Sequence, residues 1–269
     1  MKNKLYQLSS YDFIHPSDKN AMNAIEKLPG FEKFTAFIHE NTIEQYYNIY
    51  LKGGLIRLTE KNSPEILRIF RHVAEILEVS KFPDIYLQRS FRYENKIIGY
   101  ANPVVLLATS CLENMPEDRI YFIAGRCMGG IKAGHNKMEF FSELITESGM
   151  GIDVLKAAVN TLQIPLLQWR RKADLSRDRA GLLACQNYDE AMRMLMLYAG
   201  VTVGSENEIK IEDFLQQAVE FRNISGLVGK AGKYVQTLYK DSSWVIERAA
   251  ELFNWYETGE YEILMINHS

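Results

Sequence analysis

FIAGRCMGGIKAGHN, at residues 122–136, is the stretch that decides the fold. The chain is expected to be almost wholly helical after Pro116, so this stretch is predicted to form a helix. The helix carries four glycines, namely Gly125, Gly129, Gly130 and Gly134. Each glycine costs about 1 kcal/mol relative to alanine in a helix interior. The helix is therefore expected to form only if tertiary contacts hold it.

The composition is that of an ordinary soluble globular protein. Of the 269 residues, 47% are hydrophobic, which is enough for a sizeable core. The 31 basic and 34 acidic residues leave a formal charge of -3, so no general attraction to nucleic acid or to an anionic membrane is expected. The expected partner is therefore a peptide or protein ligand, with binding to neither nucleic acid nor membrane, and a homo-oligomer is left open.

Three cysteines, Cys111, Cys127 and Cys185, are widely spaced and odd in number. This pattern argues against a disulfide framework and against a structural zinc knuckle, and it suits a reducing compartment. The first residues contain two lysines without an apolar segment behind them, unlike a secretory signal. We therefore expect a cytoplasmic protein.

Local signals place helices and strands along the chain. Ser63 and Pro64 precede apolar residues at helical spacing, which predicts a helix, and Ser17 and Asp18 are capping candidates for an earlier one. Residues rich in β-branched and aromatic side chains predict strands at 55–59, 84–88 and 97–110. The last helix is expected near 244–256.

These elements predict a mainly helical α+β fold around a small sheet. No linker marks a second domain, so residues 1–269 are read as one domain. Its expected parts are an N-terminal helical part (1–80), the strands and central helices (81–200), and C-terminal helices (201–269).

The stretch at 122–136 resembles the active-site helix of the family-48 zinc metallopeptidases, gluzincins that include HtpX-type proteases and the CAAX prenyl proteases. The family's run is G-H-E-L-G-H-I-x-x-G-H. The matching residues are Gly125, Gly129, Ile131, Gly134 and His135. The segment DLSRDRAGLLACQN at 174–187 resembles the family's E-x-x-x-D-R-x-G-L-L-A segment. The resemblance covers most of residues 12–260 and implies a gluzincin-like metallopeptidase domain.

The zinc-binding residues of the family are replaced at the matching positions. Arg126 and Gly130 stand where the family has its two histidine ligands, and Cys127 stands in place of the general base. Arginine offers no lone pair and glycine has no side chain, so neither can bind zinc. Asp174 replaces the third ligand, a glutamate, and Ser242 replaces a histidine of the family's late H-P-F-P-V-L-R-like segment. We therefore predict no metal and no other cofactor.

The same substitutions suggest an ion pair where the metal would be. We expect Arg126 to pair with Asp174 in the vacated volume, with Gly130 leaving room for the guanidinium; the alternative is that Arg126 reaches solvent. Asp178, which matches a residue of the family that orients the ligands, lies one helical turn after Asp174 and shares its face. It is expected to approach Arg126 or to pair with Arg179.

In the family, the strand before the active-site helix lines the cleft and pairs with the substrate backbone. The matching residues here are Gly99, Tyr100, Ala101, Asn102 and Val104. Pro103 cannot donate to a ladder and suggests an open edge strand, to which an extended peptide can add. The alternative is a core strand with a covered edge.

Together these observations predict a pseudopeptidase. Such a protein lacks enzymatic activity and binds a peptide or protein segment in the former cleft, as an accessory in peptide maturation or as a regulator. One alternative is an enzyme with new chemistry through a reactive Cys127, and another is a structural component of an oligomer.

Overall fold

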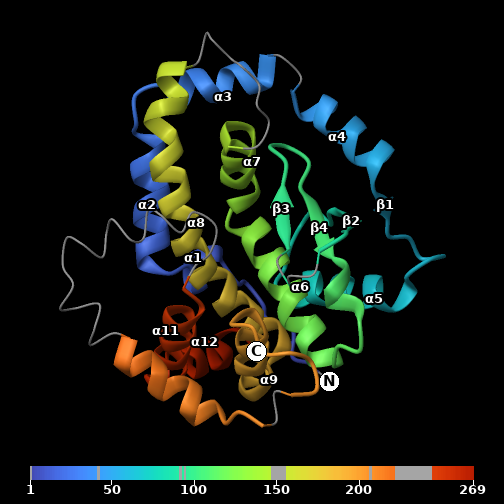
Figure 1. Ribbon diagram of the computed structural model, residues 1–269, viewed down its shortest axis with the longest axis vertical. Coiled ribbons are helices and arrows are strands. Elements are labelled where there is room, and N and C mark those ends of the chain that lie inside the picture. Colours follow the sequence, from blue (N-terminus) through green and yellow to red (C-terminus); the bar gives the residue numbers. More distant parts are fainter. Residues whose placement is uncertain are drawn as a thin grey trace.

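The computed structural model describes residues 2–40, 43–90, 93, 95–146, 156–205, 208–221 and 244–269, and they form a mainly helical α+β fold (Figure 1). The helices before and within the sheet region are α1 (Ser10–Phe13), α2 (Pro16–Glu26), α3 (Phe31–Glu40), α4 (Ile43–Gly54), α5 (Pro64–Ile76) and the 3-10 helix η1 (Thr109–Leu112). The later helices are α6 (Glu117–Lys132), α7 (His135–Thr146), α8 (Lys156–Cys185), α9 (Tyr188–Tyr198), α11 (Val245–Glu257) and α12 (Glu260–His268). The predicted fold class is confirmed.

Four strands form one mixed sheet. They are β1 (Ile56–Arg57), β2 (Asp84–Gln88), β3 (Lys96–Ile98) and β4 (Val104–Ala108), in the order β1-β2-β4-β3. The strands β2 and β4 are parallel, whereas β1 pairs with β2 and β3 pairs with β4 in antiparallel fashion. Strand β4 is therefore internal, with β1 and β3 at the edges.

This topology corrects the prediction of an open edge at Pro103. Pro103 directly precedes β4 and stands outside the ladder, where its missing N–H group costs nothing. Val104, a predicted peptide-binding residue, pairs with Asp84 on one side and Ile98 on the other. Its backbone is thus enclosed by two neighbouring strands.

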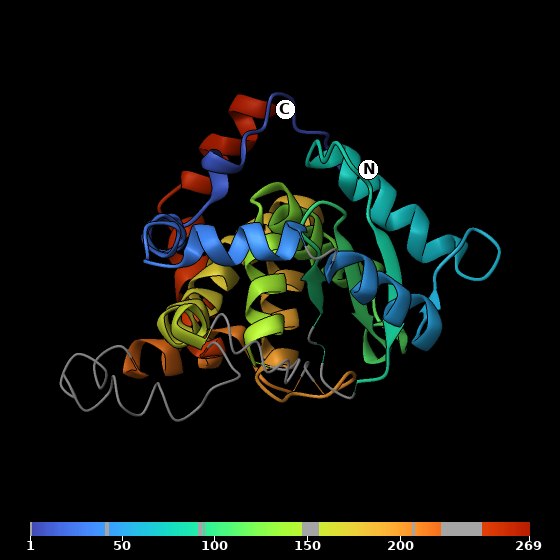
Figure 2. The same cartoon turned by 90° about the horizontal axis from the view of Figure 1, so that it is seen from above.

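All five side chains of β4 are buried, and because successive side chains point to opposite faces of the sheet, both faces are covered at this strand. Val105 and Leu107 pack into a core that includes side chains of α5 and α6. Val104 and Leu106 pack into a second core that includes side chains of α3 and α7. The strands lie at one side of the molecule and α8 lies at the other, with α6 and α7 between them (Figures 1 and 2).

Helices α6 and α8 approach closely because small residues face one another. A Cβ atom at Gly125 would lie 2.5 Å from the Cβ of Ala184 and 2.9 Å from the Cα of Gly181. A Cβ atom at Gly129 would overlap the Cβ of Ala180. Gly125 and Gly129, which weaken the isolated helix, are thus required by its packing, as the sequence predicts. Gly134 is a correction: α6 ends at Lys132, and Gly134, at φ 78°, lies in the turn before α7.

Two helix boundaries differ from their predictions. His15, not Ser17 or Asp18, is the N-cap of α2, and its ring nitrogen accepts a hydrogen bond from the Ser17 N–H. Asp18 is instead buried inside the structure. A further helix, α12, follows the one predicted to be last, after a left-handed turn at Gly259.

No described helix has the length and apolarity to cross a bilayer.

The substitution Gly129→Ala is expected to lower the free energy of unfolding by up to about 2 kcal/mol. The new methyl group would force α6 away from Ala180, and such overpacking costs about 1–3 kcal/mol, more than the roughly 1 kcal/mol that alanine gains by helix propensity. Urea unfolding measures the change. Gly53→Ala is the matched control, since a Cβ there meets no atom within 4 Å and should be neutral or stabilising. An equal loss of unfolding free energy in Gly129→Ala and Gly53→Ala would contradict the packing argument.

Candidate functional site

Arg126 of α6 lies against two carboxylates of α8. Its Nη2 donates to Asp174 Oδ1 at 2.8 Å, and its Nη1 donates to Asp178 Oδ1. The close approach of α6 and α8 permits this contact, and the i, i+4 spacing of the two aspartates puts both on the face toward α6. The predicted Arg126–Asp174 pair is confirmed, and so is the predicted approach of Asp178.

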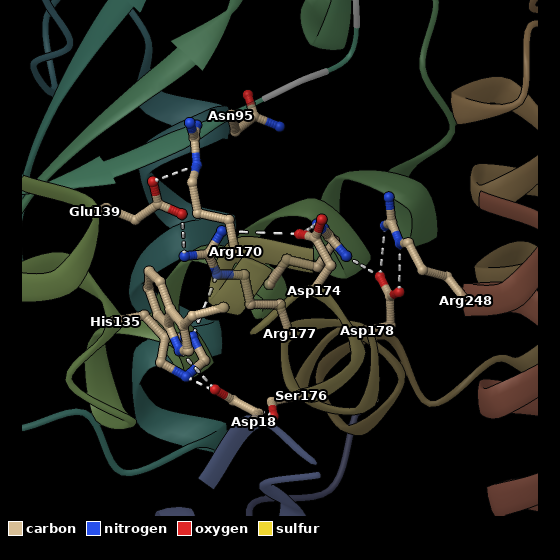
Figure 3. A network of polar contacts seen from close by, with 12 residues as sticks. Asp18, Asn95, His135, Glu139, Arg170, Asp174, Ser176, Arg177, Asp178 and Arg248 are labelled. Carbon is tan, nitrogen blue, oxygen red and sulfur yellow. Dashed lines mark hydrogen bonds and ion pairs between the residues drawn. The ribbon is translucent and has the colours of Figure 1, made fainter. Parts of the chain in front are cut away.

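Asp178 has a second arginine partner that the sequence analysis missed. Arg248 of α11 donates from Nε to Asp178 Oδ2 and from Nη2 to Oδ1, both at 2.8 Å, in a bidentate pair (Figure 3). Asp178 is 1% exposed. Arg179, the expected partner, instead stacks on Trp255 with its guanidinium carbon 4.9 Å from the ring centroid. The sequence contained one indication of the Arg248–Asp178 pair. Arg248 ends the segment SSWVIER and aligns with the last residue of the family's H-P-F-P-V-L-R-like segment.

The ring of Tyr198 connects the two arginines. The guanidinium carbons of Arg126 and Arg248 lie 5.3 Å and 5.0 Å from its centroid, within the range of cation–π attraction. Burial lowers the pKa of Arg126 from its usual value, and the nearby Arg248 cation adds to this effect. An arginine at this position nonetheless stays charged. Two carboxylates and one aromatic face therefore stabilise two buried cations.

Gly130 does not make room for Arg126, contrary to the prediction. A Cβ atom there would lie 2.5 Å from Ile97 Cδ1 and 3.2 Å from Arg177 Nε. Arg177 of α8 fills this space and donates to Glu139 Oε1 at 2.8 Å, with its Nη1 3.8 Å from Asp174 Oδ1. The volume of the absent imidazole is thus occupied by Ile97 and a different arginine.

The network extends to a buried pair between α7 and α2. Arg177 Nε donates to His135 Nδ1 at 3.3 Å, and His135 Nε2 lies 2.9 Å from Asp18 Oδ2 (Figure 3). Asp18 also accepts hydrogen bonds from Trp169 Nε1 at 2.8 Å and Ser176 Oγ at 2.5 Å. Burial by itself raises the pKa of Asp18, but His135 and these two donors outweigh burial, so the pKa is lowered from 3.8.

Cys127 points into the core. It is 3% exposed and belongs to the cluster around α5, α6 and α9. Burial raises the pKa of its thiol to about 12, and the Arg126 cation offsets this only in part. The neutral thiol is therefore the form present at neutral pH, and neutral thiols are poor nucleophiles.

Four of the five residues predicted to bind a peptide, Gly99 to Asn102, lie in the loop between β3 and β4, and Val104 lies in β4. Glu44 accepts the N–H groups of Ala101 at 3.0 Å and Asn102 at 2.8 Å. Asn136 donates to the Gly99 carbonyl at 2.6 Å. Tyr100 packs on Phe141, with ring centroids 5.9 Å apart. The N–H groups of Ala101 and Asn102 are thus used within the chain. Ser242, another predicted site position, lies outside the described residues.

A cavity of about 570 Å³ lies next to the arginine network. Tyr198, whose ring contacts Arg126, is one of its walls. The other walls come mainly from apolar side chains, among them Met196, Val201, Phe214, Trp244 and Ile246. The volume is in the range of ligand sites in proteins.

A distant relative is a named peptidase. The chain is 25% identical over 265 residues to the plastoglobule-localized metallopeptidase 48, chloroplastic, of Arabidopsis thaliana, and the match covers 96% of this chain and 76% of the relative. This chain is a distant homologue of that metallopeptidase. No family model matches the chain, and no solved structure does.

The homology raises the question of whether the site fits a metal ion. Zinc needs three or four donors from histidine, cysteine or carboxylate side chains. Asp174 Oδ1 instead accepts from Arg126, and a divalent cation beside that guanidinium would be repelled. Among the described residues, no group of three or more such side chains has the geometry to hold a metal. The residues around Arg126 therefore do not fit zinc.

The buried Asp18 is expected to make unfolding sensitive to acid. Because its folded pKa is below 3.8, its contribution is complete above that pH and is lost as the pH falls from 3.8 through the folded value. In Asp18→Asn, the slope of unfolding free energy against pH should be smaller by up to about 1.4 kcal/mol per unit in this window. Urea unfolding from about pH 5 to pH 2 measures the slope. The exposed Asp213→Asn is the control, and identical slopes for both variants would refute the role of Asp18.

Proposed function

We propose that this chain is a catalytically inactive metallopeptidase homologue that binds a peptide or protein segment, as an accessory in peptide maturation or as a regulator. The observation that carries the proposal is the pairing of Arg126 with both Asp174 and Asp178. These residues align with a zinc ligand, a further ligand and a residue that orients the ligands in the resembling family. The ion pair thus joins the helices that a metal would otherwise join.

Inactivity follows from the chemistry of the side chains. A zinc peptidase activates water by lowering its pKa on the metal and removes a proton with a carboxylate. Arg126 is a permanent cation without a lone pair, and the Cys127 thiol, with a pKa raised by burial, is no base at neutral pH. The charges of Arg126 and Arg248 balance those of Asp174 and Asp178. The substitution thus preserves the electrostatics of the fold while removing the means to activate water.

Binding is supported by the cavity beside Tyr198. Its apolar walls suit an apolar side chain of a ligand, and its contact with Arg126 through Tyr198 places it next to the former catalytic residues. The loop around Gly99 provides less support, because its N–H groups at Ala101 and Asn102 bond to Glu44. We therefore assign the retained binding function to the cavity.

The alternative function, catalysis by Cys127, has little structural support because the thiol is buried and its pKa is raised. Cys111, Cys127 and Cys185 are free and buried, which suits a reducing compartment. A cytoplasmic location stays our proposal for this chain. The relative's name places that protein in the plastoglobules of the chloroplast.

Metal analysis tests the inactivity. Protein purified without chelator should contain far less than one equivalent of zinc, because Arg126 takes the ligand position. It should also hydrolyse no peptide in a chelator-sensitive manner. An active zinc peptidase assayed in parallel is the positive control. About one equivalent of zinc, or amide cleavage that a chelator abolishes, would refute the proposal.

Thiol labelling tests the alternative. At neutral pH, iodoacetamide should label Cys127 slowly in the folded protein and rapidly in urea, since burial keeps the thiol neutral and covered. Mass spectrometry of the digested protein follows each cysteine separately. Cys111 is an internal comparison, because burial raises the pKa of its thiol to about 11. Fast, selective labelling of native Cys127 would favour the enzyme.

A further inference from the structure

The cavity beside Tyr198 has acidic side chains along one side. Residues 211–221 are helical, and their buried side includes Phe214, which lines the cavity. The segment 208–221 exposes four acidic residues and one lysine, which are Glu208, Glu212, Asp213, Glu220 and Lys210. This part of the described surface is therefore negative. Asp213 itself lines the cavity, so a carboxylate stands beside an apolar space.

The inner walls favour an apolar ligand group. Met196 is fully buried and Phe214 is 6% exposed, so the cavity reaches into the core. At its inner side, Tyr198 has the guanidinium groups of Arg126 and Arg248 near its ring. These cations are already paired with Asp178, so they are poorly suited to a second anion. An acidic ligand would thus meet repulsion from the acidic helix without a free cation among these residues to offset it.

From this complementarity we infer that the cavity takes an apolar side chain of a peptide segment that carries lysine or arginine beside that side chain. This inference rests on the proposed function and specifies the class of peptide. The apolar anchor fills the space between Tyr198, Phe214 and Trp244, and the neighbouring cation reaches Asp213. Hydrophobic burial supplies the affinity and the charge supplies the selectivity.

Three peptides of one length test the selectivity. They are acetyl-Lys-Lys-Phe-Leu-Lys-Lys-amide, its serine counterpart and its glutamate counterpart, which share the apolar pair and differ only in the flanking residues. Trp244 lines the cavity and is half-buried, whereas Trp169 and Trp255 are buried, so tryptophan fluorescence reports on the cavity. The lysine peptide is expected to bind at least ten-fold more tightly than the glutamate peptide at low salt. The difference should shrink as salt screens the charges.

Two variants connect the binding to the cavity. Asp213→Asn should lower the affinity for the lysine peptide several-fold and leave the affinity for the serine peptide unchanged. The control Asp84→Asn removes a half-exposed carboxylate on β2, outside the cavity, and should change neither. Val201→Trp should lower the affinity for all three peptides, because the larger side chain fills the cavity. The urea unfolding midpoint of this variant shows whether its fold is intact.

The outcomes separate the inference from the proposed function. Preference for the lysine peptide that depends on Asp213 supports both. Equal or tighter binding of the glutamate peptide overturns the inference, while peptide binding itself stands. Binding of no peptide by the intact protein overturns the inference and, with it, the assignment of peptide binding to this cavity.

Discussion

The contact between α6 and α8 is the constraint on which the rest of the structure depends. Two buried helices can lie this close only where their facing residues are small, and Gly125 and Gly129 meet Ala180, Gly181 and Ala184. The same proximity brings Arg126 to Asp174 and Asp178. Removing either partner of a buried ion pair leaves a charge without compensation, which costs about 3–5 kcal/mol. Packing and charge pairing are therefore mutually dependent here.

Loss of a metal site does not require loss of the fold. A zinc ion stabilises a site by attracting ligands from separate elements, and here guanidinium groups from α6 and α11 do so with carboxylates of α8. Tyr198 of α9 adds an aromatic face to both cations. The network thus joins four helices without a metal. Under the proposed function, this arrangement would hold the fold together without a metal.

The cavity at Tyr198 and the arginine network share one residue, so the proposed binding site adjoins Arg126. The walls of the cavity are mainly apolar, and Asp213 adds a carboxylate. Under the proposed function, this combination suits a ligand with an apolar group beside a basic one. The loop at Gly99–Asn102, by contrast, donates to Glu44 and accepts a hydrogen bond from Asn136 within the chain.

The sequence by itself determined the fold class, the strand at 84–88 and the presence of a short strand near 56–57, because these follow from local spacing. It offered the Arg126–Asp174 pair as one of two alternatives, from charges at positions aligned with the resembling family. Only the tertiary structure decided the rest. Strand order made β4 internal, since pairing is between segments distant in the chain. Burial of Asp18 against His135, and of Asp178 against Arg248, joins residues more than 60 positions apart. No local pattern encodes such contacts, because they depend on which helix faces meet.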